Sequence, residues 1–219
     1  DEMGVDIIQN CEAHSIKTKN GKVVGVKTSK GFINAKKVAV VASGHTSVLA
    51  KTAGVRLPLQ SRPLQALVSE PIKPVINTVV MSNAVHAYVS QSDKGELVIG
   101  GAPDSGQSFR RDIKQHVFED TVGAMLELFP SFKKLKLLRQ WGGHLDITPD
   151  ASPIMDETSV SGLYVTAGWW GGYKAIPAGG LTMAHHVATN SPHPLMEAFS
   201  YSRFKNLDYI LETGTTTAR

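Results

Sequence analysis

The stretch of sequence that decides the fold reads GLYVTAGWWGGYKAIP and spans residues 162–177. Residues 162–167 are largely apolar and predict a buried strand, and a helix is expected over residues 176–189. The glycines between them allow the backbone to approach a ligand closely, and the helix N-terminus presents free N–H groups to an anion or an electron-rich ring edge. The pattern favours a ligand-binding strand–turn–helix unit, with an ordinary tight connection as the alternative.

Two common phosphate-binding motifs are missing from the chain. Counted from Gly168, a Walker loop would need glycine where Tyr173 stands and Ser or Thr where Ala175 stands. No two glycines are separated by a single residue, so the dinucleotide fingerprint G-x-G-x-x-G is absent. This absence fits a truncated nucleotide-binding domain as well as it fits a protein that binds no nucleotide.

A second strand with a small-residue turn lies at residues 38–44, which read VAVVASG. Five consecutive apolar residues predict a central strand covered on both faces. Thr46 or Ser47 is then expected to cap a helix that runs to Ala53. A serine nucleophile elbow is excluded because Val41 occupies the position where that motif needs glycine.

The order of the elements predicts an α/β to α+β fold with an inserted domain. Asn20-Gly21 indicates a hairpin near the N-terminus, between strands at 5–14 and 22–28. Short antiparallel strands at 58–70, 78–81, 85–90, 96–100 and 137–147, with a helix at 112–128, form a long block between the two strand–turn–helix units. We therefore expect an antiparallel-sheet domain inserted into a nucleotide-binding domain, followed by a loosely held tail after Ser191.

Composition excludes several classes of protein. Of the 219 residues, 42% are hydrophobic and 19% charged, and the net charge of +4 comes from scattered basic residues rather than one basic face, which argues against nucleic-acid binding. Cys11 is the single cysteine, so no disulfide can form within the chain and a reducing cytoplasm is predicted. The longest apolar run, residues 38–42, is too short to span a bilayer.

No metal site is predicted. His144 and Asp146 point to the same face of an expected strand, but no third ligand matches them, so a polar strand face is favoured. His185 and His186 are adjacent on the expected helix and do not form an H-E-x-x-H arrangement.

Three landmarks, in this order and spacing, resemble the D-amino-acid-oxidase-like family of FAD-dependent oxidoreductases. They are VVASG at 40–44, the run from Trp141 through TPD at 148–150 to Pro153-Ile154, and the glycine-rich stretch at 162–175. Within that family, GGYKAIP at 171–177 and the opening GVDIIQ at 4–9 are most similar to the beta-subunit family of heterotetrameric sarcosine oxidases.

The resemblance implies the C-terminal half of such an enzyme. Residues 1–56 and 153–191 would form part of an FAD-binding domain of the GR2 type, residues 57–152 an antiparallel substrate domain, and residues 192–219 a tail. The phosphate-binding loop and the histidine that carries covalent FMN would both lie upstream of Asp1. FAD would be the cofactor, a small amino acid or amine the substrate, and the other sarcosine oxidase subunits the partners in a hetero-oligomer.

The resemblance also assigns roles to individual residues. Lys174 would pair with the substrate carboxylate, and Tyr88 would line the substrate pocket. The flavin ring would lie along Gly168, Gly171, Gly172, Tyr173 and Lys174, and the adenosine side of FAD near Ala42 and Gly44. The full enzyme would oxidise a secondary amine such as sarcosine to glycine and a one-carbon product.

Alternatives remain at this point. A glycine oxidase or dimethylglycine dehydrogenase type of enzyme would share every landmark. A lysine that some relatives use for oxygen activation would fall near residues 97–100, where this chain has none, so the choice between oxidase and dehydrogenase is open. If the chain is complete as given, a non-catalytic interaction module is a further possibility.

Overall fold

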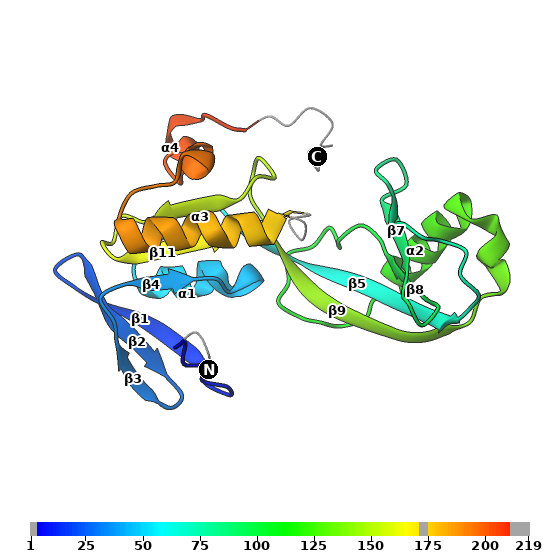
Figure 1. Ribbon diagram of the computed structural model, residues 1–219, viewed down its shortest axis with the longest axis horizontal. Helices are drawn as coiled ribbons and strands as arrows, with labels where there is room; N and C mark the ends of the chain where they lie inside the picture. The colour runs from blue at the N-terminus through cyan, green and yellow to red at the C-terminus, as the bar shows by residue number, and fades with distance from the viewer. Residues whose placement is uncertain (1–3, 171–174, 211–219) are drawn as a thin grey trace. The chain divides into compact units, whose positions relative to one another are not determined.

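The computed structural model describes residues 4–170 and 175–210, which separate into two compact units (Figure 1). The first unit contains residues 4–59, 147–170 and 175–210, and the second contains residues 60–146. In sequence, therefore, the second unit interrupts the first. Among the described residues, every helix is too short or too polar to cross a bilayer.

The first unit begins with a three-stranded antiparallel sheet in the order β1-β2-β3. Its strands are β1 (Ala13–Lys19), β2 (Lys22–Thr28) and β3 (Gly31–Asn34). The predicted hairpin turn is confirmed, because Asn20 and Gly21 have the positive φ angles of a type I′ turn, 51° and 74°. The strand predicted at residues 5–14 was wrong, because the first strand is Ala13–Lys19 and Asn10, with a φ of 52°, interrupts the extended backbone before it.

A second sheet of the first unit has the order β10-β11-β4. It consists of β4 (Val38–Val40), β10 (Ile154–Glu157) and β11 (Leu163–Ala167). Strand β11 runs parallel to β4 and antiparallel to β10. Among the described residues β11, not β4, is the central strand, and Val41 just beyond β4 is 69% exposed, so the expectation of a doubly covered central strand at 38–42 was wrong.

Alternate side chains of β11 pack into two different cores. Leu163 and Val165 join a cluster with Ala50 of helix α1 (Thr46–Thr52). Tyr164, between them, joins a cluster with Met183 of helix α3 (Ile176–Thr189), so the two faces of the strand contact different helices. The bounds of α3 are those predicted from the sequence.

The segment after Ser191 is packed rather than loosely held as far as residue 210. It contains the 3₁₀ helix η4 (Pro194–Phe199) and the short helix α4 (Arg203–Asn206). Met196 is 1% exposed and Arg203 is 4% exposed. The prediction failed because a buried arginine in this segment has a partner at residue 150, which is distant in sequence.

The second unit is built on a five-stranded sheet in the order β6-β7-β8-β5-β9. The strands are β5 (Gln60–Pro71), β6 (Val80–Ser82), β7 (Ala87–Gln91), β8 (Glu96–Gly100) and β9 (Leu137–Ile147). Helix α2 (Gln115–Leu128) is followed by the 3₁₀ helix η2 (Pro130–Lys134). Met125 of α2 packs with Leu67, Val89 and Ile99, so the helix covers one face of the sheet.

Candidate functional site

The parallel pairing of β4 and β11 brings two of the predicted cofactor-binding turns to one edge of a sheet. Leu163 pairs with Val38 and Val165 pairs with Val40, so the two strands end side by side. Residues 42–44 follow β4, and Gly168 follows β11. In open α/β sheets, ligands bind outside the carboxyl ends of parallel strands, and this edge has that geometry.

The turn after β4 is held by its own backbone and by Thr46. The N–H of Ala42 donates to Oγ1 of Thr46 at 3.1 Å, and the N–H of His45 donates to the carbonyl of Ala42 at 3.0 Å. Gly44 is buried and Ala42 is half-buried. Thr46 therefore does not cap helix α1 as expected, because its hydroxyl is directed back to the turn and His45 occupies the N-cap position.

The turn after β11 requires glycine at position 168. Gly168 has a φ of +79°, and a Cβ built there would stand 2.5 Å from Cγ2 of Thr148. The N–H of Trp170 donates to the carbonyl of Gly168 at 2.9 Å. Trp169 is anchored by its indole N–H, which donates to Oγ1 of Thr166 at 2.8 Å. The backbone of Gly168, which carries no side chain, is thus held at the carboxyl end of the central strand.

Four of the predicted site residues lie outside the described part of the structure. These are Gly171, Gly172, Tyr173 and Lys174, and their roles stay predictions. The described backbone resumes at Ala175, which is the N-cap residue of α3, and Pro177 lies in the first turn of the helix. The N-terminus of this 14-residue helix directly follows the predicted flavin turn, which is the arrangement that places free N–H groups near an electron-rich ligand.

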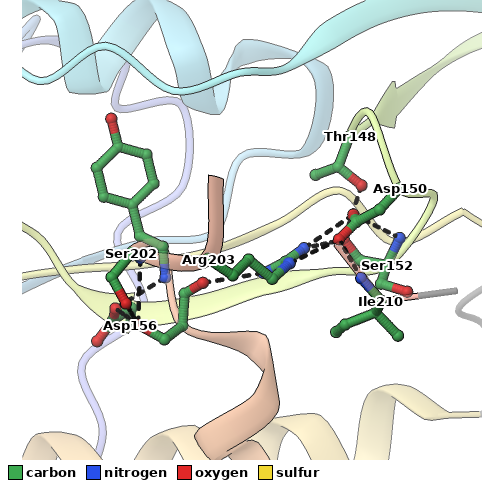
Figure 2. Close-up of polar contacts among 9 residues, drawn as sticks. Thr148, Asp150, Ser152, Asp156, Ser202, Arg203 and Ile210 are labelled. Atoms are coloured by element: carbon green, nitrogen blue, oxygen red, sulfur yellow. Dashed lines mark hydrogen bonds and ion pairs between the residues drawn. The ribbon is translucent and has the colours of Figure 1, made fainter. Parts of the chain in front are cut away.

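A buried polar cluster, missed by the sequence analysis, lies beside Gly168. Figure 2 shows the guanidinium of Arg203 directed at the carboxylate of Asp150, with Nε 2.7 Å from Oδ2 and Nη2 3.0 Å from Oδ1. Nη2 also donates to the carbonyl of Ser152 at 2.8 Å. Thr148 donates its hydroxyl to the same carbonyl at 2.7 Å. The only sequence signal for this cluster was the TPD landmark at 148–150, because no motif in the C-terminal segment pointed to Arg203.

The surroundings of Asp150 favour its charged form. Burial alone raises the pKa of this carboxyl, but the hydrogen bonds from the Arg203 guanidinium and the Ile210 N–H outweigh burial. The net result is a pKa below the usual range of an aspartate. The ion pair is therefore intact at neutral pH.

Tyr88, the predicted substrate-pocket residue, lies in the second unit on the face of the sheet opposite α2. It pairs with Gly100, which in turn pairs with Ala66, so these three residues form one row across three strands. The neighbouring row of Leu67, Val89 and Ile99 packs in the core with α2, and alternation directs Tyr88 to the other face. A Cβ built on Gly100 would stand 2.2 Å from Cζ of Tyr88, so the phenol ring lies across the glycine.

Burial raises the pKa of the Tyr88 phenol above its ordinary value. The hydroxyl therefore stays protonated through the neutral and mildly alkaline range. It can donate a hydrogen bond to an anionic ligand, but it cannot act as a base in that range.

The second unit also has a cavity of about 340 Å³ beside α2, lined in part by His86, Asp104, His116 and Asp120. Asp104 forms an ion pair with Lys114, and the hydrogen bond from this lysine lowers the pKa of the carboxyl. None of the predicted site residues that the structure describes lines this cavity.

The histidines considered as metal ligands have other contacts. His186 is 4% exposed and meets the ring of Tyr164 edge-on at 5.2 Å, while His185 meets the ring of His193 at 5.3 Å. The ring centroids of His144 and Phe109 lie 6.1 Å apart. Within the described ranges, no three histidine, cysteine or acidic residues gather in a way that could hold a metal ion.

This geometry agrees with a family match over most of the chain. Residues 1–186 match the family model described as DAO, FAD dependent oxidoreductase. The chain therefore belongs to the FAD-dependent oxidoreductase family of the D-amino-acid-oxidase type. Its fixed glycine turn at the carboxyl end of β11 and the helix N-terminus beyond it fit an FAD cofactor.

Relatives about 50% identical to this chain are beta subunits of sarcosine oxidase, which confirms the resemblance to that family. The chain is 51% identical to sarcosine oxidase subunit beta of Rhodobacter capsulatus over 213 residues, 97% of this chain and 51% of that protein. It is 50% identical to sarcosine oxidase subunit beta of an Arthrobacter species, over 97% of this chain and 53% of that protein. The chain thus spans about half the length of these relatives.

Solved structures confirm the fold. An L-proline dehydrogenase from P. horikoshii superposes with a TM-score of 0.88 at 25% identity, covering 95% of this chain and 57% of that one. Glycine oxidase from Geobacillus kaustophilus superposes with a TM-score of 0.78 at 20% identity, covering 88% of this chain and 52% of that one.

Proposed function

We propose that this chain forms part of an enzyme that uses FAD to oxidise a secondary amine or amino acid such as sarcosine. Imine hydrolysis would then release glycine and a one-carbon product. The observation that carries the proposal is the parallel pairing of β4 and β11, which places residues 42–44 and Gly168 at one carboxyl edge of a sheet. The sarcosine oxidase names of relatives about 50% identical support the choice of substrate.

Bound FAD would supply the acceptor for the two electrons that leave the substrate. The chain's own residues would bind and orient. Gly168 and the glycines at 171 and 172 would lie along the ring, Tyr173 beside it, and Ala42 and Gly44 near the adenosine. The ammonium of Lys174 would grip the substrate carboxylate, and Tyr88 would offer a protonated hydroxyl in the substrate pocket.

The proposal includes an assembly. Subunit-beta names among the relatives support further sarcosine oxidase subunits as partners, and hence a hetero-oligomer. Covalent FMN is expected in the intact heterotetramer, attached at a histidine outside this chain. The cytoplasm is the proposed compartment, on the ground of the single cysteine.

A second candidate substrate is another cyclic or N-alkylated amino acid, such as L-proline. The observation that favours it is the superposition on L-proline dehydrogenase, which covers 95% of this chain. Steady-state turnover of sarcosine and L-proline, with oxygen and with an artificial electron acceptor, distinguishes the two substrates and also decides between oxidase and dehydrogenase.

The test of the substrate assignment is Lys174→Met in the complete polypeptide that carries this chain. Methionine keeps most of the side-chain length but removes the charge that should hold the substrate carboxylate. A hydrogen bond to a charged group contributes about 1.5–3 kcal/mol, so kcat/KM for sarcosine should fall about 10- to 150-fold. If the lysine acts by binding alone, KM rises while kcat stays nearly constant.

Sarcosine methyl ester is the control because it lacks the carboxylate. Its turnover should lose much less on the same substitution, and the visible flavin spectrum should change little. Equal losses for acid and ester would show that Lys174 does not grip the carboxylate.

A further inference from the structure

Arg203 connects the C-terminal segment to the turn at residues 148–152, which we call the TPD turn. Its guanidinium makes two hydrogen bonds to Asp150 and a third to the Ser152 carbonyl, while Nη1 donates to the carbonyl of Ser200 at 3.2 Å. The N–H of Ile210 adds a contact to Oδ2 of Asp150 at 3.2 Å. The side chain of Arg203 is 4% exposed and the side chain of Asp150 is fully buried, so the pair is shielded from water.

The TPD turn needs such support because its backbone is constrained. Ala151 has a φ of 55°, a left-handed conformation that a residue with a side chain adopts at a cost. The N–H of Ala151 donates to the carbonyl of Thr148 at 3.2 Å, and the N–H of Ser152 donates to Oδ1 of Asp150 at 3.3 Å. The carboxylate that Arg203 holds is thus also the acceptor that closes the turn.

The TPD turn also packs against Gly168. A Cβ at Gly168 would stand 2.5 Å from the methyl carbon of Thr148 and 3.4 Å from Cδ2 of Leu59, so the Thr148 methyl packs directly on the glycine. The hydroxyl of the same threonine is fixed by the Ser152 carbonyl, which also accepts from Arg203. Three successive contacts therefore lead from Arg203 to the backbone at Gly168.

We propose that Arg203 is a positioning residue for the glycine turn at Gly168, acting through the TPD turn. This rests on the proposed function in one respect only, namely that the glycine turn holds FAD. The C-terminal segment then contributes to cofactor affinity without touching the cofactor.

Asp156 provides a matched control, because it forms a second set of hydrogen bonds with the same C-terminal segment. The carboxylate of Asp156 on β10 accepts from the Ser200 hydroxyl at 2.7 Å and from the Tyr201 N–H at 2.9 Å. Among the described residues, these hydrogen bonds to Asp156 do not include any residue of the TPD turn. Asp156→Ala should therefore loosen the segment while leaving the TPD turn closed.

The experiment compares Arg203→Lys, Thr148→Ser and Asp156→Ala in the complete polypeptide. Lysine keeps the charge beside Asp150 but lacks the planar guanidinium that bonds both carboxylate oxygens and the Ser152 carbonyl at once. Serine keeps the hydroxyl bond to Ser152 and removes only the methyl that packs on Gly168, so this variant should fold. Coupling through such a network typically changes binding about 2- to 30-fold, and the FAD dissociation constant should rise by that factor in the first two variants and not in the third.

Amide hydrogen exchange of the flavin-free protein tests the positioning separately from the cofactor. The Trp170 N–H, bonded to the Gly168 carbonyl, should exchange faster in Arg203→Lys and Thr148→Ser than in Asp156→Ala. If Asp156→Ala matches Arg203→Lys in both measurements, Arg203 merely stabilises the fold and the proposal is overturned. If the exchange pattern holds but the unmodified protein binds no FAD, the positioning role stands and the proposed function fails.

Discussion

At Gly100, the missing side chain makes room for the ring of Tyr88. A Cβ there would stand 2.2 Å from Cζ and 2.3 Å from the hydroxyl oxygen of the tyrosine. Because those atoms are the far end of a partly exposed side chain, the ring can swing away rather than strain the strand. The raised pKa of Tyr88 comes from burial, so it reports the position of the ring.

We predict that Gly100→Ala moves the Tyr88 ring and brings the phenol pKa back toward about 10. Ultraviolet titration of tyrosinate, compared with Tyr88→Phe to identify the signal, measures the change. Gly143→Ala in β9 is the matched control, because a Cβ there meets nothing within 4 Å. An unchanged Tyr88 titration in Gly100→Ala would contradict the ring position.

Asp150 makes the unfolding free energy of the first unit depend on pH in the acid range. Its pKa is lowered in the folded protein, so it contributes stability above the unfolded-state value of about 3.9 and loses it as the pH falls through the lower folded value. We predict an unfolding free energy that is flat for this group from pH 7 to about 5 and declines below about 4. Urea unfolding at each pH measures it.

Asp150→Asn provides the comparison. This variant should be less stable at pH 7, because Arg203 then lacks its buried counter-charge. Its pH profile should be flatter than that of the unmodified chain below about pH 4. A profile that stays as steep would assign the acid sensitivity to other carboxylates.

At the scale of elements, helix α3 carries two adjacent glycines with different surroundings. A Cβ at Gly179 would stand 2.5 Å from Cη2 of Trp169, whereas a Cβ at Gly180 would meet nothing within 4 Å. The indole of Trp169 is also fixed by Thr166, so it has little freedom to yield. Gly179 therefore sets how closely the glycine turn packs on the helix.

We predict that Gly179→Ala lowers the unfolding free energy by about 1–3 kcal/mol, because it overpacks a held side chain. Gly180→Ala should raise it by up to about 1 kcal/mol through helix propensity alone. Urea unfolding followed by tryptophan fluorescence measures both. Similar effects of the two substitutions would show that Trp169 does not pack on Gly179.

At the scale of the whole molecule, the sequence lacks the G-x-G-x-x-G loop that grips the diphosphate of a dinucleotide. The described residues offer a sheet edge for FAD, but not that loop. We predict that the 219-residue chain expressed by itself holds FAD poorly. Gel filtration with absorbance at flavin wavelengths tests this, and a yellow peak with one FAD per chain would refute it.

The sequence by itself determined the local elements. Strand β9 and helix α3 have the bounds expected from their patterns, and the Asn20-Gly21 turn follows from residues that tolerate positive φ. It also determined the family, because the landmarks at 40–44, 141–154 and 162–175 are linear motifs. Such features depend on residues close together in the chain, which is why a sequence can specify them.

Only the tertiary structure decided how distant segments meet. The strand at 38–42 looked central because it is apolar, yet β11 occupies the centre, since pairing order depends on the whole sheet. The tail after Ser191 was expected to be loosely held, yet Arg203 pairs with Asp150 across 53 residues. A buried charge is stable only beside a partner, and the partner's place is set by the folded chain rather than by spacing in sequence.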